Sequence, residues 1–266
     1  MINAFTVDLE PWMCYYEDRL LHKSLDGGNL VNTTIQLLDI LEECDATATF
    51  FTLGIVYEWY PQLLNEIRSR GHEIAFHGYS HCALKDNIIK TEIEKSKAFI
   101  ANHKIIGFRA PRMRITHRDI QSLLSAKFVY DSSFYGSYGI SRNMRGIQEV
   151  PVSTYPPRNV NATFPRTLED ALKNLEIPIG SGLFMGLLGS KLLISLIGHM
   201  NQKGLPFISF IHPWQLSSLP EARLLIGIRN MQFLYTIKIS KEKLTRILRR
   251  YVFISIREAL EEWSMN

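Results

Sequence analysis

The stretch Tyr60-Pro-Gln-Leu-Leu-Asn-Glu-Ile-Arg-Ser-Arg-Gly-His-Glu-Ile-Ala-Phe-His77 carries one complete helix-to-strand unit. Pro61 suits the first turn of a helix and Gly71 suits the position after its last residue, so a helix is predicted over residues 60–70. The apolar run at residues 73–76 predicts a short buried strand.

The same unit recurs on both sides of this stretch. Strands are predicted at residues 2–7 and 47–53, with a helix at 30–43 between them. Toward the C-terminus the pattern predicts a helix at 92–102, a strand at 104–108, a helix from the N-cap Thr116 to about residue 126, and strands at 128–130 and 205–211. Such alternation predicts parallel strands with right-handed crossovers, hence an α/β barrel or a doubly wound sheet. In both folds the active site lies at the carboxyl ends of the strands.

Length and composition set the class of protein. The chain has 266 residues, 46% of them hydrophobic, and shows no internal linker, so a single domain over residues 1–266 is predicted. The net charge of +4 is mild and the basic residues do not alternate with stacking aromatics, which argues against nucleic acid as a partner.

Three features bear on the cellular compartment. Cys14, Cys44 and Cys82 are odd in number and share no short metal-type spacing, which argues against a disulfide framework. The N-terminus lacks the charged start and apolar stretch of a secretion signal. We therefore expect a cytoplasmic protein.

Two segments raise the question of membrane contact. Residues 238–250 predict a basic amphipathic helix capped by Ser240, whose basic face is solvated or meets an anionic membrane surface. Residues 177–200 are apolar, but Lys191 lies near the middle and would cost roughly 2.5 kcal/mol or more in lipid. A buried strand-loop-helix stretch is predicted there rather than a membrane span, while peripheral contact stays open.

A metal site is predicted from two separate parts of the chain. Asp8 and Glu10 close the first strand on one face, and the spacing of His77 and His81 places two imidazoles on one side of a helical turn. Two oxygens and two nitrogens can thus meet around one divalent ion. Other chemically reactive side chains also follow predicted strands: Arg109, Asp131 and His212.

These residues lie in five motifs that resemble those of the NodB-type polysaccharide deacetylases, in the same order and over nearly the whole chain. The motifs are Thr6-Val-Asp8-Leu-Glu10, His77-Gly-Tyr-Ser-His81, Phe108-Arg109-Ala-Pro111, Tyr130-Asp131-Ser-Ser133 and Ile211-His212-Pro-Trp214. The residues of these motifs are most similar to those of the family branch found with exopolysaccharide and cell-envelope glycan loci. The resemblance implies a distorted (β/α)7 TIM-like barrel and removal of acetyl groups from N-acetylated sugars.

The resemblance also implies roles for the motif residues. His77, His81 and a carboxylate would hold a divalent metal, with zinc as the first choice. Asp8 would act as general base and His212 as general acid. Arg109, through a bidentate contact, would orient Asp8.

Two further roles follow from the resemblance. Asp131 would hold Arg109 or His212 in place. The metal, or a backbone N–H near Tyr135, would stabilise the oxyanion.

One position departs from the family pattern. The family usually has two adjacent aspartates, but the second position here is Leu9, which faces away from Asp8 on a regular strand. Glu10 returns to the correct face and is the predicted metal ligand, with Asp8 as the alternative.

Several alternatives remain open from the sequence. The same metal site would serve a hydrolase of another C–N bond in a small molecule, and the Leu9 departure is compatible with a non-catalytic glycan-binding relative. Trp12 and Trp214 either stack on a sugar or belong to the core. Residues 134–165 predict a loop over the site.

Overall fold

The computed structural model describes residues 1–15, 22–81, 88–137, 143–144, 146–157, 167–217 and 237–264. In these ranges the main sheet has nine strands, in the order β10-β1-β2-β3-β4-β5-β8-β7, with β11 paired to β1. The strands are β1 (Asn3–Leu9), β2 (Thr49–Thr52), β3 (Glu73–Phe76), β4 (Gly107–Phe108), β5 (Tyr130–Asp131), β7 (Asn143–Met144), β8 (Ile147–Glu149), β10 (Ile208–Ile211) and β11 (Phe253–Ile254). Both halves of the sequence therefore contribute to one sheet.

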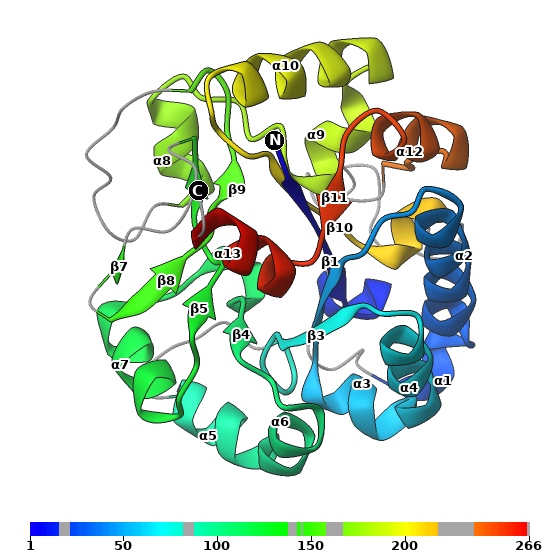
Figure 1. The fold of residues 1–266 in the computed structure, drawn as a ribbon. Coiled ribbons are helices and arrows are strands. Elements are labelled where there is room, and N and C mark those ends of the chain that lie inside the picture. The colour runs from blue at the N-terminus through cyan, green and yellow to red at the C-terminus, as the bar shows by residue number, and fades with distance from the viewer. Residues whose placement is uncertain are drawn as a thin grey trace.

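The predicted parallel pairing is confirmed. Every pair in the main sheet is parallel except β7 with β8. The sheet curls and the helices surround it (Figure 1), as expected for a distorted barrel.

A short second sheet lies between the two ends of the main one. It pairs β6 (Tyr135–Gly136) with β9 (Val152–Ser153) in parallel. The backbone of Gly180 connects β9 to β10, since its N–H donates to Ser153 O at 2.9 Å and its carbonyl accepts from Phe210 N at 2.8 Å. A Cβ at this position would overlap the Ile208 carbonyl oxygen, so this close approach requires glycine.

The helices follow the strands as the sequence predicts, with shifted ends. They are α1 (Lys23–Asp26), α2 (Asn29–Glu43), α3 (Gly54–Trp59), α4 (Pro61–Ser69), α5 (Ile88–Lys95), α6 (Lys97–His103), α7 (His117–Ser125), α8 (Leu168–Lys173), α9 (Gly182–Leu187), α10 (Ser190–Gln202), α12 (Lys241–Leu248) and α13 (Ile256–Ser264), with 3-10 turns η1 (Trp12–Tyr15), η3 (Pro111–Met113) and η4 (Pro213–Leu216). Thr116 and Ser240 are N-caps whose side chains accept from the backbone, as predicted.

Three predictions about secondary structure need correction. The helix predicted at residues 92–102 is two helices, α5 and α6, which meet at Ser96. The segment 134–165 is not one loop, because its described part holds β6, β7, β8 and β9. Residues 158–165 of that segment, like Cys82, lie outside the described residues. The His77 to His81 segment is also not helical, as described below.

The apolar stretch at residues 177–200 forms a strand-like bridge and two helices. Ile177 pairs with Tyr155, and α9 and α10 follow. Within the described ranges, the helices are too short or too polar to cross a bilayer.

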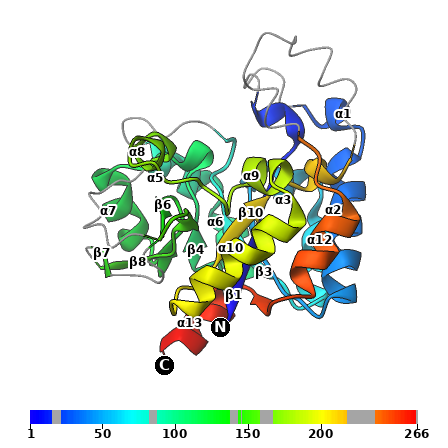
Figure 2. The ribbon, with the colours of Figure 1, turned by 90° about the horizontal axis from the view of Figure 1, so that it is seen from above.

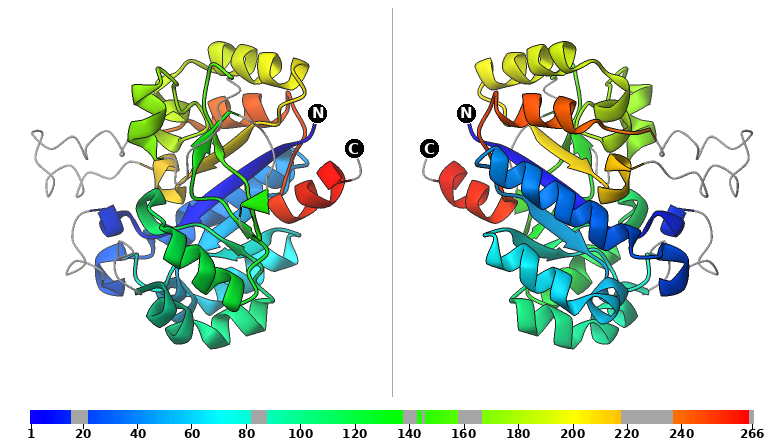
Figure 3. Two further views of the ribbon diagram at one scale, coloured as in Figure 1. Left: turned by 90° about the vertical axis from the view of Figure 1, so that its left-hand side faces the viewer. Right: turned by 90° about the vertical axis from the view of Figure 1, so that its right-hand side faces the viewer.

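Alternation along β1 separates the core from the site. Phe5, Val7 and Leu9 point outward into the large apolar cluster between sheet and helices. Ala4 points inward to a smaller cluster that Ile256 of α13 closes. Figures 2 and 3 place both chain ends and α13 at one end of the sheet and η1 with α1 at the other. The carboxyl end of β1 leads directly to η1, so the site lies at that end.

Candidate metal centre and active site

Asp8 and Glu10 are buried where β1 ends. Glu10 is 0% exposed and Asp8 is 4% exposed. Leu9 between them packs in the outer core, as predicted. A buried carboxylate needs a cation or hydrogen-bond donors, so the surroundings of these two side chains determine what the site can do.

The His77 to His81 segment is a tight loop rather than a helical turn. Gly78 has φ +85° and His81 has φ +60°, both in the left-handed region. The carboxylate of Glu92 on α5 accepts from Tyr79 N at 2.6 Å and Ser80 N at 3.0 Å. This anchor turns the chain, so that both imidazoles still face Glu10.

Three imidazole nitrogens converge on the Glu10 carboxylate. His81 Nε2 lies 2.8 Å from Oε2, His77 Nε2 lies 3.4 Å from the same oxygen, and His212 Nε2 lies 3.2 Å from Oε1. All four side chains are buried. The structure therefore brings together the predicted ligands Glu10, His77 and His81, and adds His212 to the same centre.

The hydrogen bond of His77 determines which ring nitrogen carries the proton in the neutral imidazole. His77 Nδ1 lies 2.8 Å from the Arg109 carbonyl oxygen, which can only accept, so Nδ1 carries the proton. In the neutral ring Nε2 then presents a lone pair to Glu10. A lone pair and a carboxylate repel, and a cation between them would satisfy both, so the residues present fit a divalent metal.

Gln215 imposes the same tautomer on His212. Gln215 Nε2 donates to Ile237 O at 3.3 Å, and its Oε1 accepts from His212 N at 3.0 Å. Oε1 thus also faces His212 Nδ1, at 3.3 Å, and Nδ1 must donate. Any proton that His212 gains or loses is therefore on Nε2, the atom that faces the centre. Trp214 stacks on the ring, with centroids 4.6 Å apart.

The electrostatics favour an ionised Glu10. Burial opposes its ionisation, but the charge of His81 and the close contacts of the three imidazoles outweigh burial and hold the pKa of Glu10 well below its usual range. Burial likewise lowers the pKa of His77, yet Asp8 and Glu10 outweigh it and raise the pKa.

Arg109 links Asp8 to the barrel wall. Its Nη1 donates to Asp8 Oδ1 at 2.7 Å and to Thr6 Oγ1 at 2.8 Å, while Nε and Nη2 donate to Ser132 O and Oγ. The guanidinium lies 4.1 Å from the centre of the Phe51 ring. The expected bidentate contact with Asp8 is thus a single-nitrogen contact, and the rest of the guanidinium holds Ser132.

Asp131 has a different neighbour from those predicted. Its Oδ1 accepts from Ser133 Oγ at 2.6 Å, and its carboxyl hydrogen-bonds Glu149, its register partner on β8. Burial raises the pKa of Asp131 to about 6, and burial with the Asp131 charge raises the pKa of Glu149 well above its usual range. The two carboxyls therefore share a proton. Asp131 acts on Arg109 through charge, and the contacts that hold Arg109 come from Ser132.

Sequence reasoning missed three residues of this region. Cys14 of η1 places its sulfur near Glu10 and His81, with the three ligand atoms within 4.8 Å of one another. Gln215 and Glu149 position His212 and Asp131. The i to i+4 spacing of Glu10 and Cys14 is a signal in the sequence for the position of Cys14, while Gln215 and Glu149 lie outside the five motifs.

The two tryptophans are core residues. Trp12 and Trp214 are 2% and 3% exposed. They are therefore buried in this structure rather than displayed as sugar platforms. His72 is likewise structural, because its Nδ1 accepts from Ala48 N at 3.2 Å.

Two family models match adjacent parts of this chain. One described as polysaccharide deacetylase matches residues 17–130, and one described as a domain of unknown function (DUF3473) matches residues 132–261. Residues 17–130 are thus similar to the polysaccharide deacetylase family.

Curated relatives match part of this chain. It is 28% identical over 120 residues to the peptidoglycan-N-acetylmuramic acid deacetylase PdaC of Bacillus subtilis, which covers 44% of this chain and 25% of that one. It is 32% identical over 89 residues to a chitooligosaccharide deacetylase of Rhizobium leguminosarum bv. trifolii, covering 32% and 41%. The matches thus span less than half the length of these relatives.

Solved structures show the same fold over nearly the whole chain. A Mycobacterium smegmatis protein of the polysaccharide deacetylase type gives a TM-score of 0.61 at 17% identity, covering 98% of this chain and 89% of that one. PdaC of Bacillus subtilis gives 0.51 at 16%, covering 99% and 92%. A CE4 family pseudoenzyme from Bacillus anthracis gives 0.52 at 14%, covering 98% and 65%. At these identities the likeness concerns the fold alone.

Proposed function

We propose that this protein is a metal-dependent hydrolase that removes an N-acetyl group from an N-acetylated sugar of a polysaccharide or glycan precursor. The convergence of His77, His81 and His212 on Glu10, beside an Asp8 paired with Arg109, carries the proposal. The names of the curated relatives, which act on peptidoglycan and chitooligosaccharides, support an N-acetylated hexosamine glycan as the substrate.

Glu10, His77 and His81 would hold the metal, with zinc as the first choice because imidazole and carboxylate ligands suit it. Once bound, such a metal activates water and polarises the acetamide carbonyl. The buried Asp8, Arg109 and His212 would supply the rest of the chemistry.

We assign the proton transfers to Asp8 and His212. Asp8, paired with Arg109 at 2.7 Å, would accept the proton of the attacking water. His212 would deliver a proton from Nε2 to the leaving amine, because Gln215 retains the proton on Nδ1. Asp131 would act through the charge of the pair that it forms with Glu149. A backbone N–H near Tyr135, or the metal, would stabilise the oxyanion.

Acetate release from a panel of N-acetylated glycans tests the proposal. We expect release from chitooligosaccharides or peptidoglycan fragments, loss of release with a chelator, and recovery with zinc. Metal-dependent hydrolysis of only small cyclic imides or amides would support the other C–N hydrolase. Glycan binding without release would support the non-catalytic relative.

We further propose a cytoplasmic location with peripheral membrane contact through the basic face of α12. Two of its charges already have partners, since Lys241 pairs with Glu43 at 2.7 Å and Arg246 with Glu242 at 2.8 Å. Co-sedimentation with anionic vesicles tests this contact, and equal sedimentation with neutral vesicles would contradict a charge-driven one.

A further inference from the structure

We propose that the thiolate of Cys14 is an additional ligand of the metal centre, a role that rests on the metal site of the proposed function. Such a ligand would make the centre a mixed carboxylate, imidazole and thiolate site. The resemblance to the family implies only histidines and a carboxylate.

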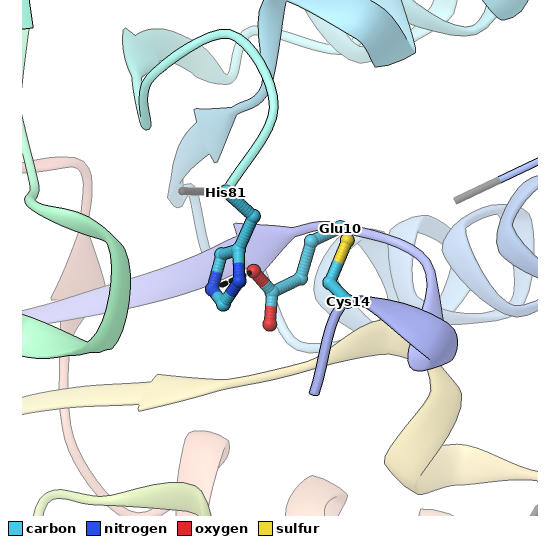
Figure 4. A group of neighbouring side chains, drawn as sticks. All are labelled: Glu10, Cys14 and His81. Carbon is cyan, nitrogen blue, oxygen red and sulfur yellow. Dashed lines mark ion pairs between the residues drawn. The ribbon is translucent and has the colours of Figure 1, made fainter. Parts of the chain in front are cut away.

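The chain turn after β1 places Cys14 beside Glu10. Pro11 begins the turn, and Cys14 N donates to Pro11 O at 3.0 Å. Cys14 then lies in η1, 3% exposed, four positions after Glu10. Figure 4 shows Glu10 between Cys14 of the same segment and His81 from the loop after β3.

The distances suit one shared ion after small adjustments. One ligand atom each of Glu10, Cys14 and His81 lies within 4.8 Å of the other two. Around a tetrahedral zinc, with Zn–S of about 2.3 Å and Zn–N of about 2.0 Å, neighbouring ligand atoms lie about 3.5 Å apart. A rotation of the Glu10 or Cys14 side chain would cover the difference.

A second observation points to a cation at the same place. Both oxygens of Glu10 are fully buried and make no geometrically defined hydrogen bond in the described part of the chain. Their near neighbours are instead imidazole nitrogens, of which His77 Nε2 carries a lone pair in the neutral ring. A group of this kind is stable when a cation occupies its centre.

Charge balance favours a thiolate. Asp8 is already neutralised by Arg109, which leaves Glu10 as the anionic partner among the predicted ligands. A second negative charge from Cys14 would match a divalent ion at this buried position. Thiolate ligands also favour zinc and cobalt over magnesium, calcium and manganese.

Cobalt substitution of the full-length Cys44→Ser/Cys82→Ser variant tests this ligand, because Cys14 is then the only thiol in the chain. Thiolate coordination gives an intense near-ultraviolet charge-transfer band that imidazole and carboxylate ligands do not give. We expect this band at full cobalt occupancy, and we expect a sulfur neighbour at about 2.3 Å in zinc X-ray absorption.

The outcomes separate the two proposals. Cobalt bound without the charge-transfer band would overturn the role of Cys14 and leave the metal site standing. No bound cobalt would overturn both. In the wild-type background, Cys14→Ser should remove the band and weaken zinc binding at least about tenfold, while Cys44→Ser should change neither.

Discussion

Arg109 and Asp8 are 101 positions apart in the chain, yet Arg109 Nη1 lies 2.7 Å from Asp8 Oδ1 at the carboxyl end of the barrel. The same nitrogen donates to Thr6, one inward-facing position earlier on β1. Arg109, which directly follows β4, thus contacts two consecutive inward residues of β1 and fixes the carboxylate that we assign as the base.

Two substitutions of Arg109 should separate the effect of its positive charge from the effect of its planar hydrogen bonds. Arg109→Met leaves the buried Asp8 carboxylate without its cation and should cost about 3–5 kcal/mol of unfolding free energy. Arg109→Lys keeps the charge but loses the planar contacts to Ser132, so we expect acetate release to fall about tenfold to hundredfold with the protein folded. Thermal unfolding and kcat/KM measure the two effects. The exposed Arg112→Lys is the matched control; full activity in Arg109→Lys would contradict the positioning role.

Gln215 offers a test of the proton on His212. In Gln215→Glu a carboxylate would accept from Nδ1–H and hold the imidazolium more firmly. The alkaline limb of the pH dependence of kcat/KM should then move up by about one unit. The same change at the exposed Gln202, Gln202→Glu, should leave the profile where it is. An unmoved alkaline limb in Gln215→Glu would remove His212 as the acid.

The Asp131 and Glu149 pair predicts a pH dependence of stability. Because the pKa of Asp131 rises from 3.8 unfolded to about 6 folded, the folded state binds a proton that the unfolded state releases. This contribution to the free energy of unfolding is fully present below about pH 4 and is lost as pH rises through about 6. Within that range the free energy of unfolding falls by up to about 1.4 kcal/mol per pH unit for each proton. The still higher pKa of Glu149 extends the loss upward.

Glu149→Gln should remove much of this loss. The amide can donate to Asp131 without a shared proton, and its oxygen can still accept from Phe134 N, as Glu149 does at 3.1 Å. We expect the melting temperature of the variant to fall less than that of the wild type as pH rises through about 6, where Asp131 titrates. Glu261→Gln, at an exposed position of α13, is the control. Parallel curves for Glu149→Gln and the wild type would show that no proton is shared.

The fold was predictable because its signals are local. The apolar run of β3, with Pro61 and Gly71 bounding the preceding helix, matches α4 and β3 closely. The ends of β4 and β5 were not predictable, because each has two residues and its pairing depends on the neighbouring strands.

The sequence predicted which residues form the site better than it predicted how they are arranged. Strand alternation placed Asp8 and Glu10 on one face and Leu9 on the other, and the structure agrees. The histidine spacing was interpreted as helical, but Gly78 at φ +85° makes it a loop anchored by Glu92. Contacts that depend on tertiary structure, such as the one between Asp131 and Glu149, have no signal in a single sequence.

Metal content measured beside turnover in Asp8→Asn and Glu10→Gln tests the central claim most directly. Glu10 is the carboxylate on which His77 and His81 converge, whereas Asp8 is paired with Arg109. We expect Asp8→Asn to retain stoichiometric zinc and to release no acetate, and Glu10→Gln to lose the zinc. Zinc retained by Glu10→Gln and lost from Asp8→Asn would contradict the assignment of ligand and base.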